Sequence, residues 1–178
     1  MSDSTVEPSG PGRARFWLTV FLVGLVLSGV TAFPLTWELN VLSRILGIPN
    51  GADPATGADP ATFSGLRFWI ATVREGLVET DARFPFLAYG TDWLAFGHLA
   101  IAILFLPAVR DPIRMRPLLV SGLWICALVI PLALVCGPIR GIPFYWRLID
   151  CGFGVVGAVP LVLALRALPP EIRERNTV

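Results

Sequence analysis

The sequence lacks lysine altogether, and its fourteen basic residues are all arginine, which we attribute to codon usage rather than to mechanism. It contains one histidine and three cysteines, none of them in a C-x-x-C arrangement, so a structural zinc site is excluded. Charged residues make up only 15% of the chain, and a net charge of +1 is too small for a nucleic-acid-binding surface. We therefore expect no metal, no cofactor and no nucleic acid partner.

Apolar residues are abundant instead, at 54% of the chain, with a mean hydropathy of +0.69. They gather in four stretches, at residues 16–33, 94–109, 118–135 and 149–168. Each is about as long as a helix that crosses a ~30 Å hydrocarbon layer, and in lipid a single open segment satisfies its own backbone only as a helix. The sequence predicts an all-α integral membrane protein, with a four-helix bundle at 16–168, a disordered tail at 1–15 and a second tail at 169–178.

Arginine is unevenly distributed between the two sides of this bundle. One side carries Arg13, Arg15, Arg110, Arg114, Arg116, Arg166, Arg173 and Arg175. Because cytoplasmic loops are enriched in basic residues, we expect a multi-pass protein of the cell membrane with both termini in the cytoplasm. The first stretch has an alternative interpretation as a signal peptide, since it ends in small residues at 30–32, but it is longer than the usual apolar region of such peptides.

The connection at residues 34–91 is predicted to lie outside the membrane and to contain two amphipathic helices, at 35–46 and 63–83. Trp37, Phe68 and Trp69 are candidate anchors at the level of the lipid headgroups. Glu79 and Arg83 have the spacing of a favourable helical ion pair. Between the helices, the hexapeptide GADPAT occurs twice in tandem at 51–62, and its proline and glycine content indicates a spacer rather than a calcium site.

Two patterns that resemble motifs are better explained by helix packing and local geometry. Gly152, Gly154 and Gly157 match a dinucleotide-binding fingerprint, but that loop needs a preceding strand, whereas these glycines lie inside an apolar span. Glycines at this depth allow helices to approach closely. Cys136 and Cys151 are expected at the two ends of an outer turn, where a disulfide is an alternative to the favoured pair of free thiols.

Polar residues that need an explanation gather at the predicted outer end of the bundle. They are Glu38, Tyr89, Asp92, His98, Arg140, Arg147 and Asp150. Ionisable groups at the hydrocarbon edge are costly unless paired, so they indicate a functional site or a structural ion pair such as Arg147 with Asp150. On the same stripe of the fourth span, Gly154 and Gly157 leave a groove without side chains. Either another helix backbone or a flat apolar ligand would fill that groove.

Asp92 and His98 each have a structural and a functional interpretation. Asp92 stands at the predicted start of the second span, where its carboxylate would cap the first free N–H groups. His98 lies within the span and needs a hydrogen-bond partner there, whether it is structural or transfers a proton.

A short segment resembles a known family of membrane domains. Residues 33–42, FPLTWELNVL, are similar to the end of the first helix in EXPERA domains, the group that contains the sigma-2 receptor and a sterol isomerase. The resemblance implies four spans, a ligand cavity and an acidic residue facing it, for which Glu38 is the counterpart. Glu75 and Glu79 match a further family acid in the amphipathic helix. In the second span the family has a buried acid, whereas this chain has His98.

Three classes of function are compatible with these observations. The first is binding of a lipid- or sterol-like ligand by Glu38, Tyr89, Asp92, His98, Arg147, Asp150, Gly154 and Gly157. If such a protein were an isomerase, His98 and Glu38 would exchange protons with a ring carbon of the substrate. The second is an accessory subunit that contacts partner membrane proteins through the fourth span. The third, a transporter or channel, is the weakest because the first and third spans carry no interior charge.

Overall fold

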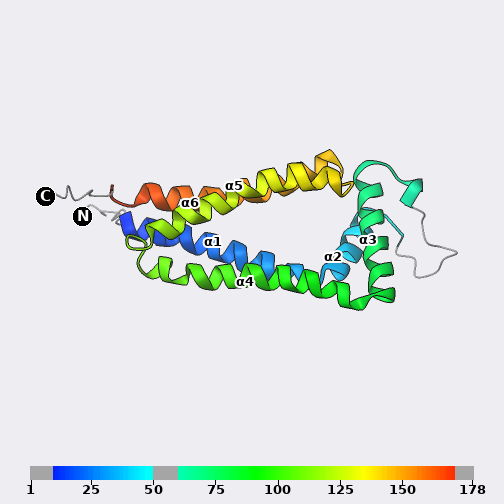
Figure 1. Cartoon of the computed structure of the whole chain (residues 1–178), viewed down its shortest axis with the longest axis horizontal. Coiled ribbons are helices and arrows are strands. Elements are labelled where there is room, and N and C mark those ends of the chain that lie inside the picture. Colours follow the sequence, from blue (N-terminus) through cyan, green and yellow to red (C-terminus); the bar gives the residue numbers. More distant parts are fainter. Residues whose placement is uncertain (1–9, 50–59, 171–178) are drawn as a thin grey trace, which may run out of the picture. The chain divides into compact units, whose positions relative to one another are not determined.

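The structure is a computed structural model that describes residues 10–49 and 60–170. This part of the chain contains six α-helices, two short 3-10 helices and no strand. The α-helices are α1 (Gly10–Ala32), α2 (Leu35–Ile45), α3 (Gly65–Arg83), α4 (Tyr89–Arg110), α5 (Arg116–Ile139) and α6 (Phe144–Ala167), drawn in Figure 1. Four of them, α1, α4, α5 and α6, are long and apolar enough to cross a membrane. The predicted all-α architecture with four spans is confirmed.

All four spanning helices extend beyond the apolar stretches that predicted them, and α4 and α5 do so by beginning at Tyr89 and by continuing to Ile139. α1 begins at Gly10, so residues 10–15 are helical and do not belong to a disordered tail. α6 begins at Phe144 rather than at 149, directly after Pro143. Hydrophobicity marks only the lipid-facing length of a span, whereas the helix continues through polar residues until its backbone is capped.

The described chain divides into two compact units. The first unit contains the start of α1, the end of α4 and all of α5 and α6, and the second contains residues 25–101. Each unit is described by itself below.

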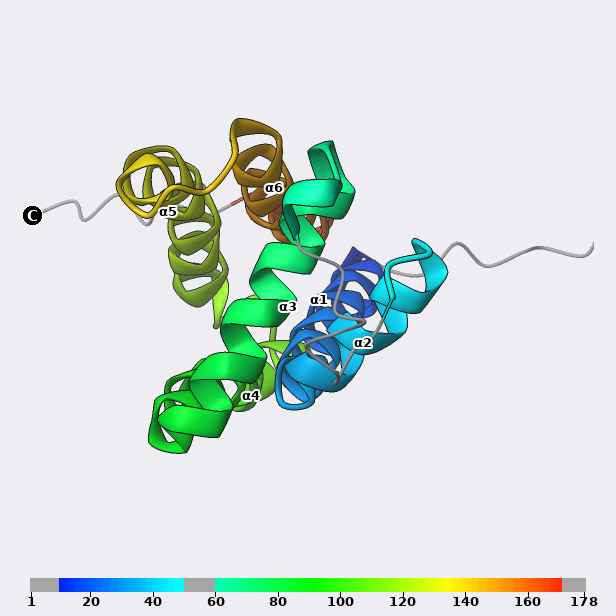
Figure 2. The same ribbon diagram turned by 90° about the vertical axis from the view of Figure 1, so that its right-hand side faces the viewer.

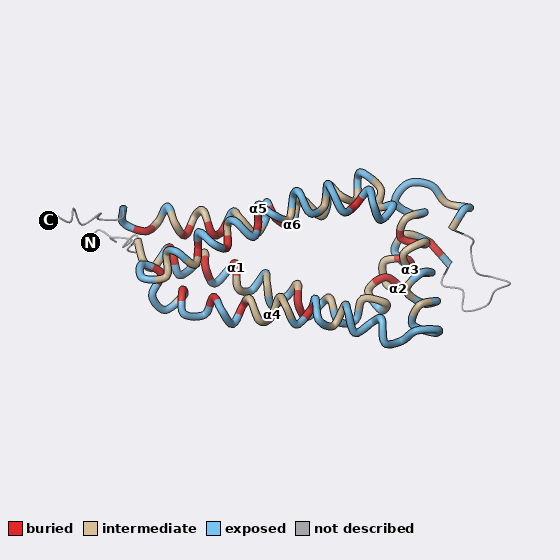
Figure 3. The backbone as a smooth tube through the Cα atoms, in the orientation of Figure 1, coloured by how far each residue is buried: buried red, intermediate tan, exposed pale blue. Residues whose placement is uncertain are grey.

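The core of the first unit is built around Phe105 of α4. Its ring packs against the ring of Phe21 in α1, with 5.0 Å between the centroids. On the α5 side, Gly122 makes room for it, since a Cβ at that glycine would lie 2.8 Å from Phe105 Cζ. Leu161 Cδ1 would lie 3.0 Å from the same Cβ, and Leu161 and Leu119 are both fully buried. Figure 3 shows the buried positions that recur along α5 and α6.

α5 and α6 form an antiparallel hairpin whose turn is specified by Gly141. Gly141 has a φ of +71°, a conformation that favours glycine. The N–H of Ile142 donates to the Gly137 carbonyl at 2.9 Å, and the N–H of Gly141 donates to the Pro138 carbonyl at 3.1 Å. These two bonds are a Schellman motif, which satisfies the last carbonyl groups of α5 before α6 begins.

In the second unit, α2 and α3 pack against each other (Figure 2). Leu39, Ile70 and Ala71 are buried between them, and Arg74 Nε donates a hydrogen bond of 2.6 Å to Asn40 Oδ1. α2 also ends in a Schellman motif, at Gly47. Both predicted amphipathic helices are confirmed, with Glu79 and Arg83 paired at 3.2 Å.

The face of α2 opposite this contact is apolar and exposed. It carries Trp37, Val41 and Ile45 at helical spacing, of which Trp37 and Ile45 are 65% and 75% exposed and Val41 is half-buried. Phe68 of α3 is also exposed, whereas Trp69 is half-buried. The first repeat and the start of the second lie outside the described residues, and Pro60–Thr62 form a 3-10 turn.

Candidate functional site

The structure assigns the predicted outer residues to different units. Glu38, Tyr89, Asp92 and His98 belong to the second unit, and Arg140, Arg147, Asp150, Gly154 and Gly157 belong to the first. Within the described residues of the second unit, no hydrogen bond or ion pair joins Glu38 to Tyr89, Asp92 or His98.

His98 has the partner that a histidine within a span requires. Its Nδ1 lies 2.8 Å from the carbonyl oxygen of Leu94, one turn earlier in α4. Because a carbonyl only accepts, Nδ1 carries the proton in this bond. The structural interpretation of His98 is sufficient, and no described acid lies within hydrogen-bond distance to share a proton with it.

Asp92 does not cap α4, contrary to the sequence prediction. The helix begins three residues earlier, at Tyr89, because the 3-10 turn Pro85–Ala88 leads directly into it. Asp92 therefore lies within the first turn, where its charge still interacts favourably with the positive end of the helix dipole. Tyr89 is 62% exposed and makes an edge-on ring contact with Trp93, an arrangement typical of aromatic residues at a membrane surface.

The predicted ion pair between Arg147 and Asp150 is wrong for the described part of the chain. Arg147 instead packs its aliphatic stem on Gly137 of α5, and its Cζ lies 5.2 Å from the centroid of the Phe144 ring. Its Nε is buried without a described hydrogen-bond partner. The side chain is directed towards α5, away from the next turn of α6, where Asp150 lies.

Gly154 and Gly157 are contact points between α5 and α6. A Cβ at Gly154 would lie 2.5 Å from the Cys126 carbonyl oxygen, and one at Gly157 would lie 3.2 Å from Cys126 Sγ. The neighbouring helix α5 therefore fills the space beside these glycines. Of the two alternatives that the sequence left open, a helix backbone occupies this space and a flat ligand does not. The three cysteines, Cys126, Cys136 and Cys151, are free, as favoured.

Beside this contact, α5 and α6 form the walls of an open groove with a volume of about 480 Å³. Its walls are almost entirely apolar. They consist of Leu123, Cys126, Ala127 and Ile130 from α5, and Gly154, Val155, Ala158, Val159, Val162, Leu163 and Arg166 from α6. Among these lining residues, Arg166 is the one with a charged side chain.

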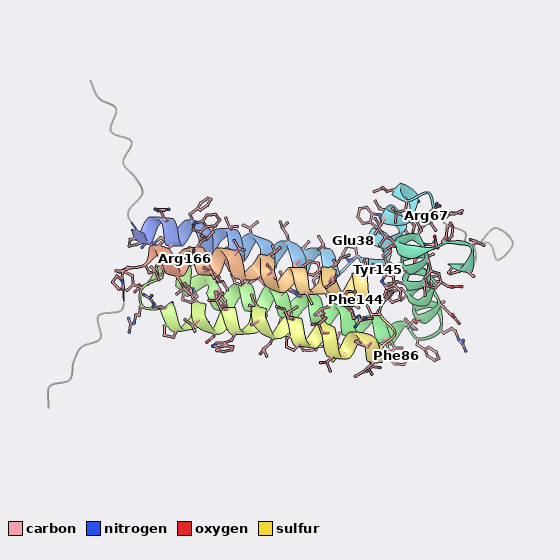
Figure 4. The ribbon with its side chains drawn as sticks, turned by 90° about the horizontal axis from the view of Figure 1, so that it is seen from above. Glu38, Arg67, Phe86, Phe144, Tyr145 and Arg166 are labelled. Atoms are coloured by element: carbon pink, nitrogen blue, oxygen red, sulfur yellow. The ribbon has the colours of Figure 1, made fainter. Side chains whose placement is uncertain are left out.

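The groove is long and charged at one end only. Gly154 and Arg166 are twelve residues apart, which corresponds to about 18 Å along a helix. Figure 4 shows Arg166 near one end of α6 and Phe144 near the other. The shape and the apolar walls of this groove suit an elongated apolar molecule. Among the described residues, no three His, Cys, Asp or Glu side chains are placed to hold a metal ion.

The sequence alone did not locate this groove. Of the predicted site residues, only Gly154 lines it. Cys126, Ala127 and Ala158 are small residues in the third and fourth spans, but spans that are apolar all round give no indication of which face meets which. In the sequence, Arg166 indicates only the orientation of the chain in the membrane.

Comparisons with known protein families, with curated proteins and with solved structures found no match to this chain.

Proposed function

We propose that this protein binds a lipid-like apolar ligand, with an alkyl or acyl chain lying in the groove between α5 and α6. The observation that carries the proposal is the groove itself, with its apolar walls and a length of about 18 Å. One leaflet of a ~30 Å hydrocarbon layer is about 15 Å thick, so the groove matches a single lipid chain.

The shape of the two helices supports a chain in preference to a bulky ring system. Gly154 and Gly157 hold α5 and α6 in close contact, and the groove beside this contact is lined by these two helices only and is open to the outside. Burial of a chain in such a groove yields dispersion contacts with well-ordered walls. The polar residues Glu38, Asp92 and His98, proposed from the sequence as ligand contacts, are not needed for this mode of binding.

The test is to fill the groove from each wall. We expect Ala158→Phe in α6 and Ala127→Phe in α5 to reduce the lipid that remains bound after purification in a mild detergent, measured by mass spectrometry of the extract. Val156→Phe is the matched control, because Val156 also lies in α6, is 70% exposed and does not line the groove.

The accessory-subunit hypothesis predicts a different outcome of the same experiment. If the groove receives a helix of a partner protein, Ala158→Phe and Ala127→Phe would release a co-purifying protein and leave bound lipid unchanged. Equal lipid retention in all three variants, each shown to be folded by its melting temperature, would overturn the proposal.

A further inference from the structure

The end of the groove at Arg166 is rich in arginine. In the described part of the first unit, the same end carries Arg13, Arg15, Arg110, Arg114, Arg116 and Arg166 against a single acid, Asp111. Contacts bring these segments together. A Cβ at Gly10 in α1 would lie 2.6 Å from the Ala167 carbonyl oxygen, and Arg116 Nη1 donates to the Pro169 carbonyl at 2.8 Å.

The arginines at this end differ in what they already bind. Arg15 Nη2 donates to the Arg110 carbonyl at 3.0 Å, so Arg15 and Arg116 both satisfy main-chain carbonyls beyond their own helices. Asp111 accepts a hydrogen bond from the backbone N–H of Arg114. Arg166 lines the groove, is exposed and has no described hydrogen bond or ion pair. Its guanidinium is therefore available to a ligand.

We infer that the ligand is an anionic phospholipid, whose acyl chain occupies the groove and whose phosphate is bound by Arg166. This inference rests on the proposed function. Guanidinium binds phosphate through paired, charge-assisted hydrogen bonds, and basic pockets between membrane helices are suited to anionic headgroups. The surrounding arginines add attraction without direct contact. If the arginine-rich side is cytoplasmic, the lipid comes from the inner leaflet.

The experiment compares two lipids with identical acyl chains, anionic phosphatidylglycerol and zwitterionic phosphatidylcholine. Each is titrated into the purified full chain in detergent, and bound lipid is counted by native mass spectrometry. We expect the wild type to prefer phosphatidylglycerol and Arg166→Gln to bind it about fivefold more weakly, the effect of one arginine near a lipid surface. Phosphatidylcholine binding should fall less, because its choline cation partly offsets the charge of the phosphate that both lipids carry. Arg140→Gln, an exposed arginine at the far end of α5, is the control and should behave as the wild type.

The outcomes separate this inference from the proposed function. Equal binding of both lipids by the wild type, with loss of both in Ala158→Phe, would overturn the headgroup assignment and keep the groove. Unchanged binding of both lipids in Ala158→Phe would overturn the groove as well. An equal loss of phosphatidylglycerol in Arg140→Gln would show general attraction by surface charge, which also contradicts a site at Arg166.

Discussion

At Gly154 the two helices of the hairpin meet main chain to main chain. Since a Cβ there would lie 2.5 Å from the Cys126 carbonyl oxygen, Gly154→Leu must push α5 and α6 apart. We expect a loss of about 1–3 kcal/mol of stability or more, the usual range for overpacking a well-packed contact. The measurement is the melting temperature of the detergent-solubilised protein.

Gly97→Leu is the matched control for that substitution. Gly97 is also a glycine inside a membrane-length helix, α4, but beyond the adjacent residues and backbone of its own helix no described atom lies within 4 Å of a Cβ built on it. Equal loss of stability in both variants would contradict the packing role of Gly154.

Arg147 and Asp150 give a second prediction at the scale of single residues. No described ion pair joins them. The stability losses caused by Arg147→Gln and by Asp150→Asn should therefore add, to within about 0.5 kcal/mol, in the double variant. Arg147→Gln should be the more harmful of the two, since it removes the contacts with Gly137 and Phe144. Thermal melting of the three variants tests this. A double variant more stable than Asp150→Asn alone would show that the pair does interact.

At the scale of elements, the exposed apolar side chains of α2 predict where this helix lies relative to the membrane. It begins three residues after α1 ends, so it lies close to the membrane surface, and its exposed side chains Trp37 and Ile45 would otherwise face water. We expect Trp37 to lie among the lipid headgroups, as amphipathic helices and tryptophan do.

Fluorescence quenching in vesicles can locate Trp37. The difference between wild type and Trp37→Phe isolates its emission from that of the other tryptophans. Lipids brominated near the headgroup should quench this difference more strongly than lipids brominated near the chain end. Quenching by aqueous iodide, with none by either brominated lipid, would place α2 in water.

At the scale of the whole molecule, four spans require both termini to lie on the same side of the membrane. A reporter fused after Val178 should report the cytoplasm, and one inserted in the repeat at 51–62 should report the outside, because the arginine-rich ends face inwards under the positive-inside rule. A C-terminal reporter on the outside would contradict the proposed orientation, and termini on opposite sides would contradict the even number of spans.

The sequence by itself determined the fold class, the four spans and the two amphipathic helices. These follow from apolar length and from helical periodicity, which are properties of one segment at a time. The ion pair of Glu79 with Arg83 was equally local and was also predicted. The start of α4 was missed because a 3-10 turn continues into the helix without a change in hydrophobicity.

Only the tertiary structure decided what the polar residues and glycines do. It directed Arg147 towards Gly137 and away from Asp150, and it placed Gly154 against the backbone of α5. It also aligned Ala127, Ala158 and Arg166 along one groove. A span that is apolar on all sides carries no pattern that marks its contact face. Which face contacts which neighbouring helix is therefore decided only by the packing of the helices.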